Sequence, residues 1–474
     1  MEDICDMNIP TPDRARNDRL VRLYPLFVSL MFLIATPIAV LYTKEWDFFA
    51  NLWRILTSPS ELITDYFALG GLGSTLFNAA VCGLAANAII YLCRADAHAT
   101  VLAGYMLVVA HCFYGLNFLN MWPSFFGVIL YCKVMRRPLS ENIHVAFFST
   151  ALAPFVSEVL FRYHIGSFDA SRTQISVIGI ILTLVCGLAV GFVVPALLPG
   201  TTSMHRGYNL YKAGLAIGIL GIFIHAFMHR TLGVDHPEKI VIDNPDYFAL
   251  PYAYRGFMNV FFFVLFALTL LLGIILNGHS LKGYRVLTQS TGHGIDFTDK
   301  FGMPLCMINL AVYGFCILAY LNLVFIIPDV FPALPAGVGF TGPTVGVVFA
   351  ALTFAADGQH PRNVFPIVLG YIALFLTMVA ICLIAGFDIP WTLSTQAYIN
   401  GLAFATGLCP IAGRYGIGYG ILAGALHAMI CTVTADMHGG YVLYNGGFTA
   451  GLTALVLIPI LDFYKVKELR DSDS

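Results

Sequence analysis

Long apolar runs, each of about 18 residues or more, recur from one end of this 474-residue sequence to the other. Only 11% of the residues are charged, whereas soluble domains carry about 25%. An apolar run of that length can cross the hydrocarbon core of a membrane as a helix. The sequence therefore predicts an all-α, multi-pass protein whose main partner is the lipid bilayer.

Fourteen segments are candidates for membrane spans. Several are short or broken by Gly and Pro, and two of them, near 121–135 and 395–413, could be re-entrant hairpins instead of full crossings. The fourteen candidates are 23–43, 68–93, 100–118, 121–135, 144–161, 175–198, 213–232, 255–277, 303–327, 337–356, 364–387, 395–413, 417–436 and 446–463.

The distribution of Lys and Arg predicts the orientation of these spans. Arg14, Arg16, Arg19 and Arg22 precede the first apolar run, which is too long for a signal peptide and lacks a cleavage site. With the N-terminus inside, fourteen crossings leave 18 Lys and Arg in cytoplasmic segments and 7 outside, as the positive-inside rule requires. We therefore expect both termini in the cytoplasm. The net charge of −2 gives no reason to expect nucleic acid as a partner.

A polar turn followed by an apolar run occurs twice in the chain. Residues 204–218 read MHRGYNLYKAGLAIG and residues 437–451 read MHGGYVLYNGGFTAG, with eight of the fifteen positions identical. Shorter matches follow the same order in both halves, from WRILT and YRVLT through NAAVCG and NLAVYG to LAP and LCP. Ordered matches of this kind indicate that a whole membrane unit was duplicated.

The number of crossings in each unit sets the relative orientation of the two units. Seven is an odd number, so the units face opposite ways and form inverted repeats, which offer similar half-sites to both membrane faces. If one hairpin in each half is re-entrant, each unit has six crossings and the repeats are parallel instead. The predicted domains are a cytoplasmic tail 1–22, membrane repeat one 23–235, a connecting loop 236–254, membrane repeat two 255–463 and a cytoplasmic tail 464–474.

Two pairs of asparagines occupy matched positions in the repeats. Asn78 and Asn309 lie within apolar spans, and Asn120 and Asn363 form the second pair. A buried amide needs hydrogen-bond partners, and bonding between helices is the ordinary role of such residues. The functional alternative is that these four side chains bind a polar solute near the middle of the membrane.

Two matched prolines interrupt spans, and a charged residue follows each of them by four positions. Pro154 precedes Glu158, and Pro410 precedes Arg414. A proline frees backbone groups, and the N–H groups of a broken helix can hold an anion, although close packing of small residues is the alternative reading. Charges inside a membrane are functional candidates by default, while Arg414 also fits a span end at the interface.

The duplicated turns carry His205 and Tyr208 in the first half and His438 and Tyr441 in the second. Because histidine exchanges protons near neutral pH, these four residues are candidates for a gate or for the lining of a solute path. Capping at the membrane interface is the alternative. Asp436 precedes only the second turn, and this asymmetry makes it the candidate for binding a coupling proton or cation.

Motifs of enzymes and cofactors are scarce. The sequence contains no HExxH, GxSxG, GxxxxGK[ST] or GxGxxG motif, and its eleven cysteines are scattered singly. His225 and His229 have one-turn spacing but no third ligand at a telling distance, so an interface anchor is favoured over a metal site. We expect no cofactor and no metal and lean against an enzyme, and we leave a homo-oligomer open.

Over nearly its whole length the chain resembles a family of prokaryotic polytopic membrane proteins catalogued as a domain of unknown function. The residues that carry this resemblance are GQHPRNVFPIVLGY, GLCPIAGRYG and MHGGYVLYNGGFTAG. The resemblance implies the plasma (inner) membrane of a prokaryote and no particular substrate. Residues 207–218, GYNLYKAGLAIG, also look like the Gly-Tyr-Asn turn of urea transporters, although the second copy has Val442 where that pattern has Asn.

Duplication and matched polar groups together predict a transporter of a small polar or anionic solute, with coupling to protons or Na⁺ as an option. The first alternative is a passive channel of urea-transporter type, whose flux would ignore pH and Na⁺ gradients. The second alternative is a membrane-embedded enzyme or a structural subunit of a complex, and the sequence does not name the solute.

Overall fold

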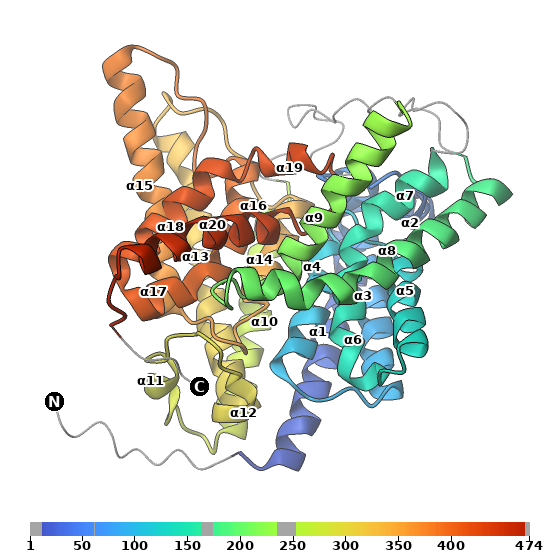
Figure 1. Ribbon diagram of the computed structural model, residues 1–474, viewed down its shortest axis with the longest axis horizontal. Coiled ribbons are helices and arrows are strands. Elements are labelled where there is room, and N and C mark those ends of the chain that lie inside the picture. The colour runs from blue at the N-terminus through green and yellow to red at the C-terminus, as the bar shows by residue number, and fades with distance from the viewer. Residues whose placement is uncertain (1–11, 61, 163–173, 235–252, 470–474) are drawn as a thin grey trace.

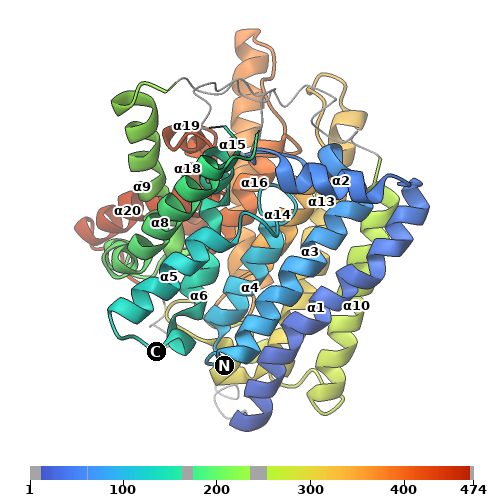
Figure 2. The same cartoon turned by 90° about the vertical axis from the view of Figure 1, so that its right-hand side faces the viewer.

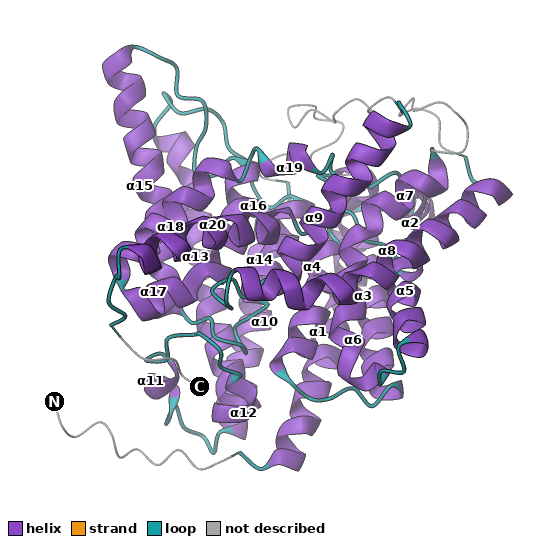
Figure 3. Ribbon diagram, in the orientation of Figure 1, coloured by secondary structure: helices purple, strands orange, loops and turns teal. Residues whose placement is uncertain are grey.

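The structure is a computed structural model that describes residues 12–60, 62–162, 174–234 and 253–469. Within these ranges every regular element is a helix, as Figure 3 shows. Most of the predicted connecting loop 236–254 lies outside the described residues. The predicted all-α fold is therefore confirmed for the described part of the chain.

The first half of the chain folds into the helices that Figure 1 draws in blue and green. They are α1 (Arg14–Thr43), α2 (Phe48–Thr57), α3 (Tyr66–Leu92), α4 (Ala99–His111), α5 (Trp122–Val134), α6 (Leu139–Ser149), the 3-10 turn η1 (Thr150–Leu152), α7 (Ala153–Phe161), α8 (Val177–Met204), α9 (Lys212–Ala226) and the π-helical turn η3 (Phe227–Thr231).

The second half repeats this order of elements. It contains α10 (Arg255–Leu276), α11 (Tyr284–Leu287), α12 (Phe297–Phe301), α13 (Met303–Val330), α14 (Gly342–Leu352), α15 (Pro361–Ala385), α16 (Gln396–Ala405), the 3-10 turn η4 (Thr406–Leu408), α17 (Cys409–Tyr415), α18 (Ile417–Ile430), α19 (Thr434–Met437) and α20 (Asn445–Phe463). Helix α1 thus corresponds to α10, α3 to α12 with α13, α4 to α14, α5 to α15, and α9 to α20.

All fourteen predicted spans are helical. Nine helical segments of the described chain are long and apolar enough to cross a membrane, with α6, η1 and α7 counted together, and α4, α5, α14 and α18 are shorter apolar helices. Helix α5 has 13 residues and is therefore about 20 Å long, less than the roughly 30 Å of the hydrocarbon core. The re-entrant character proposed for 121–135 and 395–413 stays a prediction.

Each repeat bends at a matched glycine. Gly71 lies inside α3 with φ 79°, and Gly302 joins α12 to α13 with φ 82°. L side chains are strained at these dihedral angles, whereas glycine adopts them freely. Just before each bend, Asp65 and Asp296 accept hydrogen bonds from the backbone N–H groups that begin the helix, so both copies start this span in the same way.

Matched helices of the two repeats run antiparallel. The Arg16 guanidinium at the start of α1 donates to the Leu276 carbonyl at the end of α10 at 2.8 Å. Tyr42 at the other end of α1 packs on Phe257 at the start of α10, with 5.6 Å between ring centroids, and Figure 2 shows the two helices side by side. Because α1 and α10 are the same element in the two copies, the repeats are inverted, as the odd number of crossings predicts.

The two copies exchange helix caps. One carboxylate oxygen of Asp65 accepts the N–H of Gly342, the first residue of α14, at 2.8 Å. One carboxylate oxygen of Asp296 accepts the N–H of Ala99, the first residue of α4, at 3.0 Å. Each aspartate thus caps a helix of the opposite repeat. Such reciprocal contacts between matched residues are typical of two bodies related by a two-fold axis.

The pseudo-two-fold axis passes between α9 and α20. A Cβ placed on Gly214 would overlap the backbone of Gly447, its matched residue in the duplicated motif. One turn further along, Gly218 packs on Phe448, and the matched Gly451 packs on Leu215. The contact therefore maps onto itself when the repeats are exchanged, and the glycines allow this close approach.

The duplicated turns cross the boundary between the repeats. The Leu210 amide donates to the Gly407 carbonyl at 3.0 Å, and the Leu443 amide donates to the Ala151 carbonyl at 2.9 Å. Both acceptors lie in 3-10 turns, η4 and η1, that interrupt a helix just before its proline. The predicted broken helices are therefore present, and each is held by the turn of the other copy.

We expect Gly214→Ala to destabilise the protein by about 1–3 kcal/mol, because the new methyl group forces the backbones of α9 and α20 apart. A thermal unfolding midpoint measured in detergent would report this loss. Gly418→Ala in α18 is the matched control, since nothing lies within 4 Å of its Cβ position. The control should keep or slightly raise the midpoint, and equal midpoints for both variants would contradict the close crossing.

Candidate functional site

Asn78 and Asn309 perform the same task in their own repeats. The Asn78 amide donates to the carbonyls of Cys112 and Leu116, both at 3.0 Å. The Asn309 amide donates to the two matched carbonyls of the second repeat, both at 2.7 Å. These carbonyls follow the ends of the short helices α4 and α14, where the chain unwinds. The two side chains lie apart in separate halves, and their predicted contact with a solute stays a prediction.

Asn120 and Asn363 hold the same unwound connectors. The Asn120 amide donates to the Gly115 carbonyl at 2.9 Å, and the Asn363 amide donates to the Gly358 carbonyl at 2.8 Å. Both side-chain oxygens also accept a backbone N–H three residues earlier. The four asparagines therefore satisfy backbone groups that would otherwise be unpaired at membrane depth.

Glu158 and Arg414 occupy matched positions but do not meet. Glu158 pairs with Arg162 one helical turn away at 3.3 Å, and both side chains are buried. Arg414 pairs with Glu468, which lies in the predicted C-terminal tail. Arg414 thus ends α17 and reaches the tail, as expected of a residue at a span end. The role of both residues in solute binding stays a prediction.

The two duplicated turns have different polar surroundings. The Tyr208 hydroxyl donates to that of Tyr415 at 3.2 Å, and its ring packs on His293 at 4.5 Å between centroids. The Tyr441 hydroxyl lies 2.7 Å from Nε2 of His229 and the two rings are stacked. Both turns combine tyrosine with histidine, which fits the predicted lining without establishing it.

The two turn histidines are buried, whereas the predicted coupling residue is not. Neither ring nitrogen of His205 has a hydrogen-bond partner among the described residues. The His438 ring uses Nε2 toward the side-chain oxygen of Asn445 at 3.0 Å. Asp436 is exposed in the short helix α19.

A cluster of aromatic and polar side chains lies where the repeats meet. It consists of His111 and Tyr114 from the end of α4, and of Tyr211 and Tyr444 from the duplicated turns. Ring centroids are 5.5 Å apart for His111 and Tyr114, 5.5 Å for His111 and Tyr444, and 6.2 Å for Tyr211 and Tyr444. We call these four residues the seam cluster, and all four are buried.

Most polar atoms of the seam cluster have no partner within the described part of the chain. The atoms without a partner are Nδ1 and Nε2 of His111 and the hydroxyl oxygens of Tyr114 and Tyr444. The Tyr211 hydroxyl, by contrast, donates to the Ala350 carbonyl at 2.5 Å. Buried polar groups in proteins are nearly always paired, because burial without a hydrogen bond is costly. Several such groups at one place mark the best candidate for a functional site.

The second repeat has different residues at the positions that match the α4 side of the cluster. Phe354 stands where the first repeat has His111 and packs on Tyr211 at 4.7 Å, as His111 packs on Tyr444. Asp357 stands where the first repeat has Tyr114. The Asp357 side chain is buried as well.

Sequence reasoning did not single out His111 and Tyr114. Both lie within the predicted span 100–118, and neither has an identical partner in the second copy, so comparison of matched residues does not reveal them. A usable signal was the pair of polar side chains in HCFYG, within an otherwise apolar span. The contact of His111 with Tyr444, the residue that precedes α20, gives this pair its importance.

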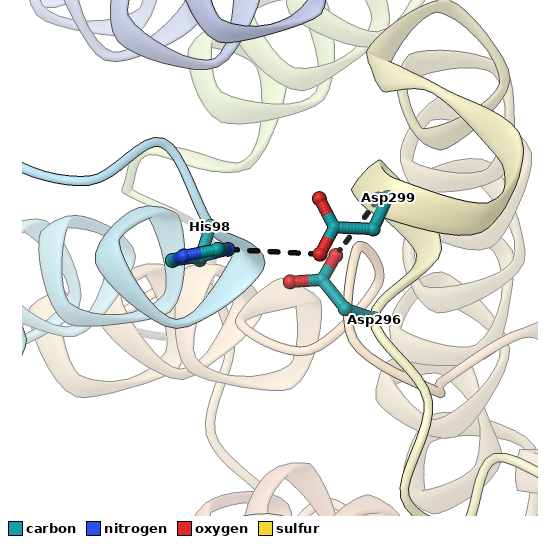
Figure 4. Close-up of side chains that lie close together, drawn as sticks. All are labelled: His98, Asp296 and Asp299. Atoms are coloured by element: carbon teal, nitrogen blue, oxygen red, sulfur yellow. Dashed lines mark hydrogen bonds and ion pairs between the residues drawn. The ribbon is translucent and has the colours of Figure 1, made fainter. Parts of the chain in front are cut away.

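His98, Asp296 and Asp299 form the one cluster of three metal-ligand residues among the described residues, and Figure 4 shows it. Nδ1 of His98 lies 3.7 Å from a carboxylate oxygen of Asp299, whose side chain is 61% exposed. Both oxygens of Asp296 already accept backbone N–H groups as helix caps. Capping by Asp296 and an exposed ion pair between His98 and Asp299 account for this arrangement.

Two inverted repeats of helices that meet at a buried polar seam define a multi-pass membrane protein made by duplication. The chain belongs to the family described as "Protein of unknown function (DUF1576)", which matches residues 44–230 and again residues 276–463. The double match confirms the duplication and the resemblance to a family of unknown function, whereas it does not test the likeness to urea transporters. It leaves out α1 and α10, the first helix of each repeat. No curated protein and no solved structure matches the chain.

We expect the stability of the protein to fall as the pH is lowered from 7 toward 5. Burial lowers the pKa of His205 and of His438 to about 4, below the ordinary value of about 6.5. Between these values the unfolded chain binds more protons than the folded one, so lowering the pH favours unfolding. The measurement is the thermal unfolding midpoint in detergent against pH.

The double variant His205→Gln, His438→Gln should show a flatter dependence of the midpoint on pH. His279→Asn is the control, because His279 is exposed and its positive φ of 58° suits Asn. An unchanged slope in the double variant would show that these two histidines are not the titrating groups.

Proposed function

We propose that the protein is a secondary transporter that moves a small polar or anionic solute through the seam between its repeats. The observation that carries this proposal is the seam cluster, with unpaired polar atoms of His111, Tyr114 and Tyr444 buried where the copies meet. A site at the interface of inverted repeats can be approached from either membrane face by related movements of the two halves.

The chemistry of the cluster suits a small hydrogen-bonding solute. Two phenol hydroxyls can donate or accept, and a neutral imidazole offers one donor and one acceptor. Helix α9 begins directly after Tyr211, and α20 begins directly after Tyr444. The first N–H groups of a helix carry partial positive charge, so two such ends beside the cluster favour a negative group.

The duplicated turns are the proposed gates of this path. Each turn contributes one tyrosine to the seam cluster and places a second tyrosine and a histidine further out, at Tyr208 and His205 in one copy and at Tyr441 and His438 in the other. Because the repeats are inverted, the turns belong to opposite sides of the path. Glu158, Arg414 and the four asparagines then support this path from the connectors and broken helices.

Uptake into proteoliposomes tests the transport proposal. A panel of small anions and neutral polar solutes is offered with and without pH and Na⁺ gradients. Tyr444→Phe should slow uptake of the transported solute about fivefold to tenfold, the effect of losing one hydrogen bond of about 1–1.5 kcal/mol. The same variant should unfold at an unchanged or higher temperature, because the hydroxyl that it removes has no partner among the described residues.

Tyr24→Phe is the matched control, since the Tyr24 hydroxyl is buried and lies 3.4 Å from that of Thr269, between α1 and α10. It should lower stability and leave uptake unchanged. If uptake ignores both gradients, the protein is a passive channel. If correctly folded protein moves no solute, a membrane enzyme or a structural subunit replaces the proposal.

Coupling to protons would make uptake depend on pH. If the buried carboxyl of Asp357 carries the proton, Asp357→Asn should abolish the dependence of uptake on pH. If the exposed carboxyl of Asp436 carries it, Asp436→Asn should abolish that dependence instead. A dependence on Na⁺ that only Asp436→Asn removes would indicate cation coupling at that residue.

The protein is further proposed to lie in the plasma membrane of a prokaryote with both termini in the cytoplasm. The excess of Lys and Arg in the predicted inside segments supports this orientation. A C-terminal green fluorescent protein fusion in a bacterium should fluoresce, and a C-terminal alkaline phosphatase fusion should be inactive. The reverse pattern would contradict the orientation. Fusion of the same two reporters within the predicted outer loop 44–62 is the internal control, since there the phosphatase should be active and the fluorescent protein dark.

A further inference from the structure

An apolar groove lies in the second repeat between α13, α14, α15 and α16. Its volume is about 520 Å³, within the range of pockets that hold small ligands. None of its nineteen lining residues is charged. Its buried lining residues include Tyr313, Ala351 and Thr406. The lining therefore matches an uncharged hydrocarbon ligand.

The groove opens sideways. Leu323 on α13 and Phe365 on α15 line it and are 61% and 59% exposed. Both helices are long and apolar enough to cross a membrane, so exposed apolar side chains on them contact lipid. Along α13 the lining extends over 313–323, which corresponds to about 15 Å or half of the hydrocarbon core, the depth of one leaflet.

Comparison of the repeats explains why the second repeat has room for this groove. At the matched place in the first repeat, the rings of Phe125 and Phe147 pack together with 5.9 Å between centroids, and both are buried. In the second repeat these positions are Val368 and Ala403, and both line the groove. Replacing large side chains by small ones leaves space that the surroundings only partly refill.

The apolar lining and the lateral opening of the groove decide which ligand can fill this space. An empty apolar cavity forfeits packing contacts, and water along this almost wholly apolar surface would find few polar partners. An acyl chain offers apolar contacts along the whole groove and can enter through the lateral opening. We propose that the groove binds one acyl chain of a phospholipid, from the leaflet on the side where α13 ends, with its terminal methyl group near Tyr313. This site goes beyond the proposed transport and does not depend on it.

Photolabelling of the full-length protein tests the site. The protein is reconstituted in phosphatidylcholine vesicles in which one acyl chain carries a diazirine near its end, then irradiated and mapped by peptide mass spectrometry. Adducts should be enriched within residues 313–323 over two references. The references are the matched residues 82–92 of the first repeat and the exposed Ile384 of α15.

Val368→Phe combined with Ala403→Phe restores the two rings of the first repeat and should fill the groove. Loss of the adducts in 313–323, with labelling at Ile384 retained, is the expected result. Single Val368→Phe is the milder variant if the double one fails to fold, as judged by its thermal unfolding midpoint. Labelling of the wild-type groove at the same level as Ile384, or adducts that persist in the filled variant, would overturn the proposal.

Discussion

Hydrocarbon supplies no hydrogen bonds, so every backbone group at membrane depth needs a partner within the protein. This chain interrupts its helices near the seam in both copies, at the connectors after α4 and α14 and at the 3-10 turns η1 and η4. Asn78 and Asn309 satisfy the carbonyls within their own repeat. The remaining partners come from the other repeat, through Asp65, Asp296 and the duplicated turns. Neither half can therefore complete its hydrogen bonds alone.

Inverted duplication makes differences between matched positions informative. Where both copies keep a residue, as at Gly214 and Gly447 or at the four asparagines, the residue serves the shared scaffold. Where the copies differ, the local chemistry has diverged. His111 contacts Tyr444 at the seam, whereas the other copy has Phe354 at the matched position, and Val368 leaves room on the lipid side where the first repeat has a ring.

The polar seam and the apolar groove follow from the same architecture. Short helices and broken helices bring side chains and helix ends to the boundary between the copies, where a hydrogen-bonding solute is proposed to bind. Long helices on the outside carry no charged side chains around the groove. The proposed solute path between the copies is thus kept apart from the lipid-facing surface that carries the groove.

The sequence alone determined the helical segments, the duplication and the matched asparagines, and it favoured inverted repeats while leaving parallel ones open. These features depend on the length and number of the apolar runs and on matches that occur in the same order in both halves. All of these can be read directly from the linear sequence. The tertiary structure alone decided that Glu158 and Arg414 take separate partners, and that His111 lies beside Tyr444. Residues 111 and 444 are brought together only by the crossing of helices from both copies, because packing between distant segments leaves no periodic trace in the sequence.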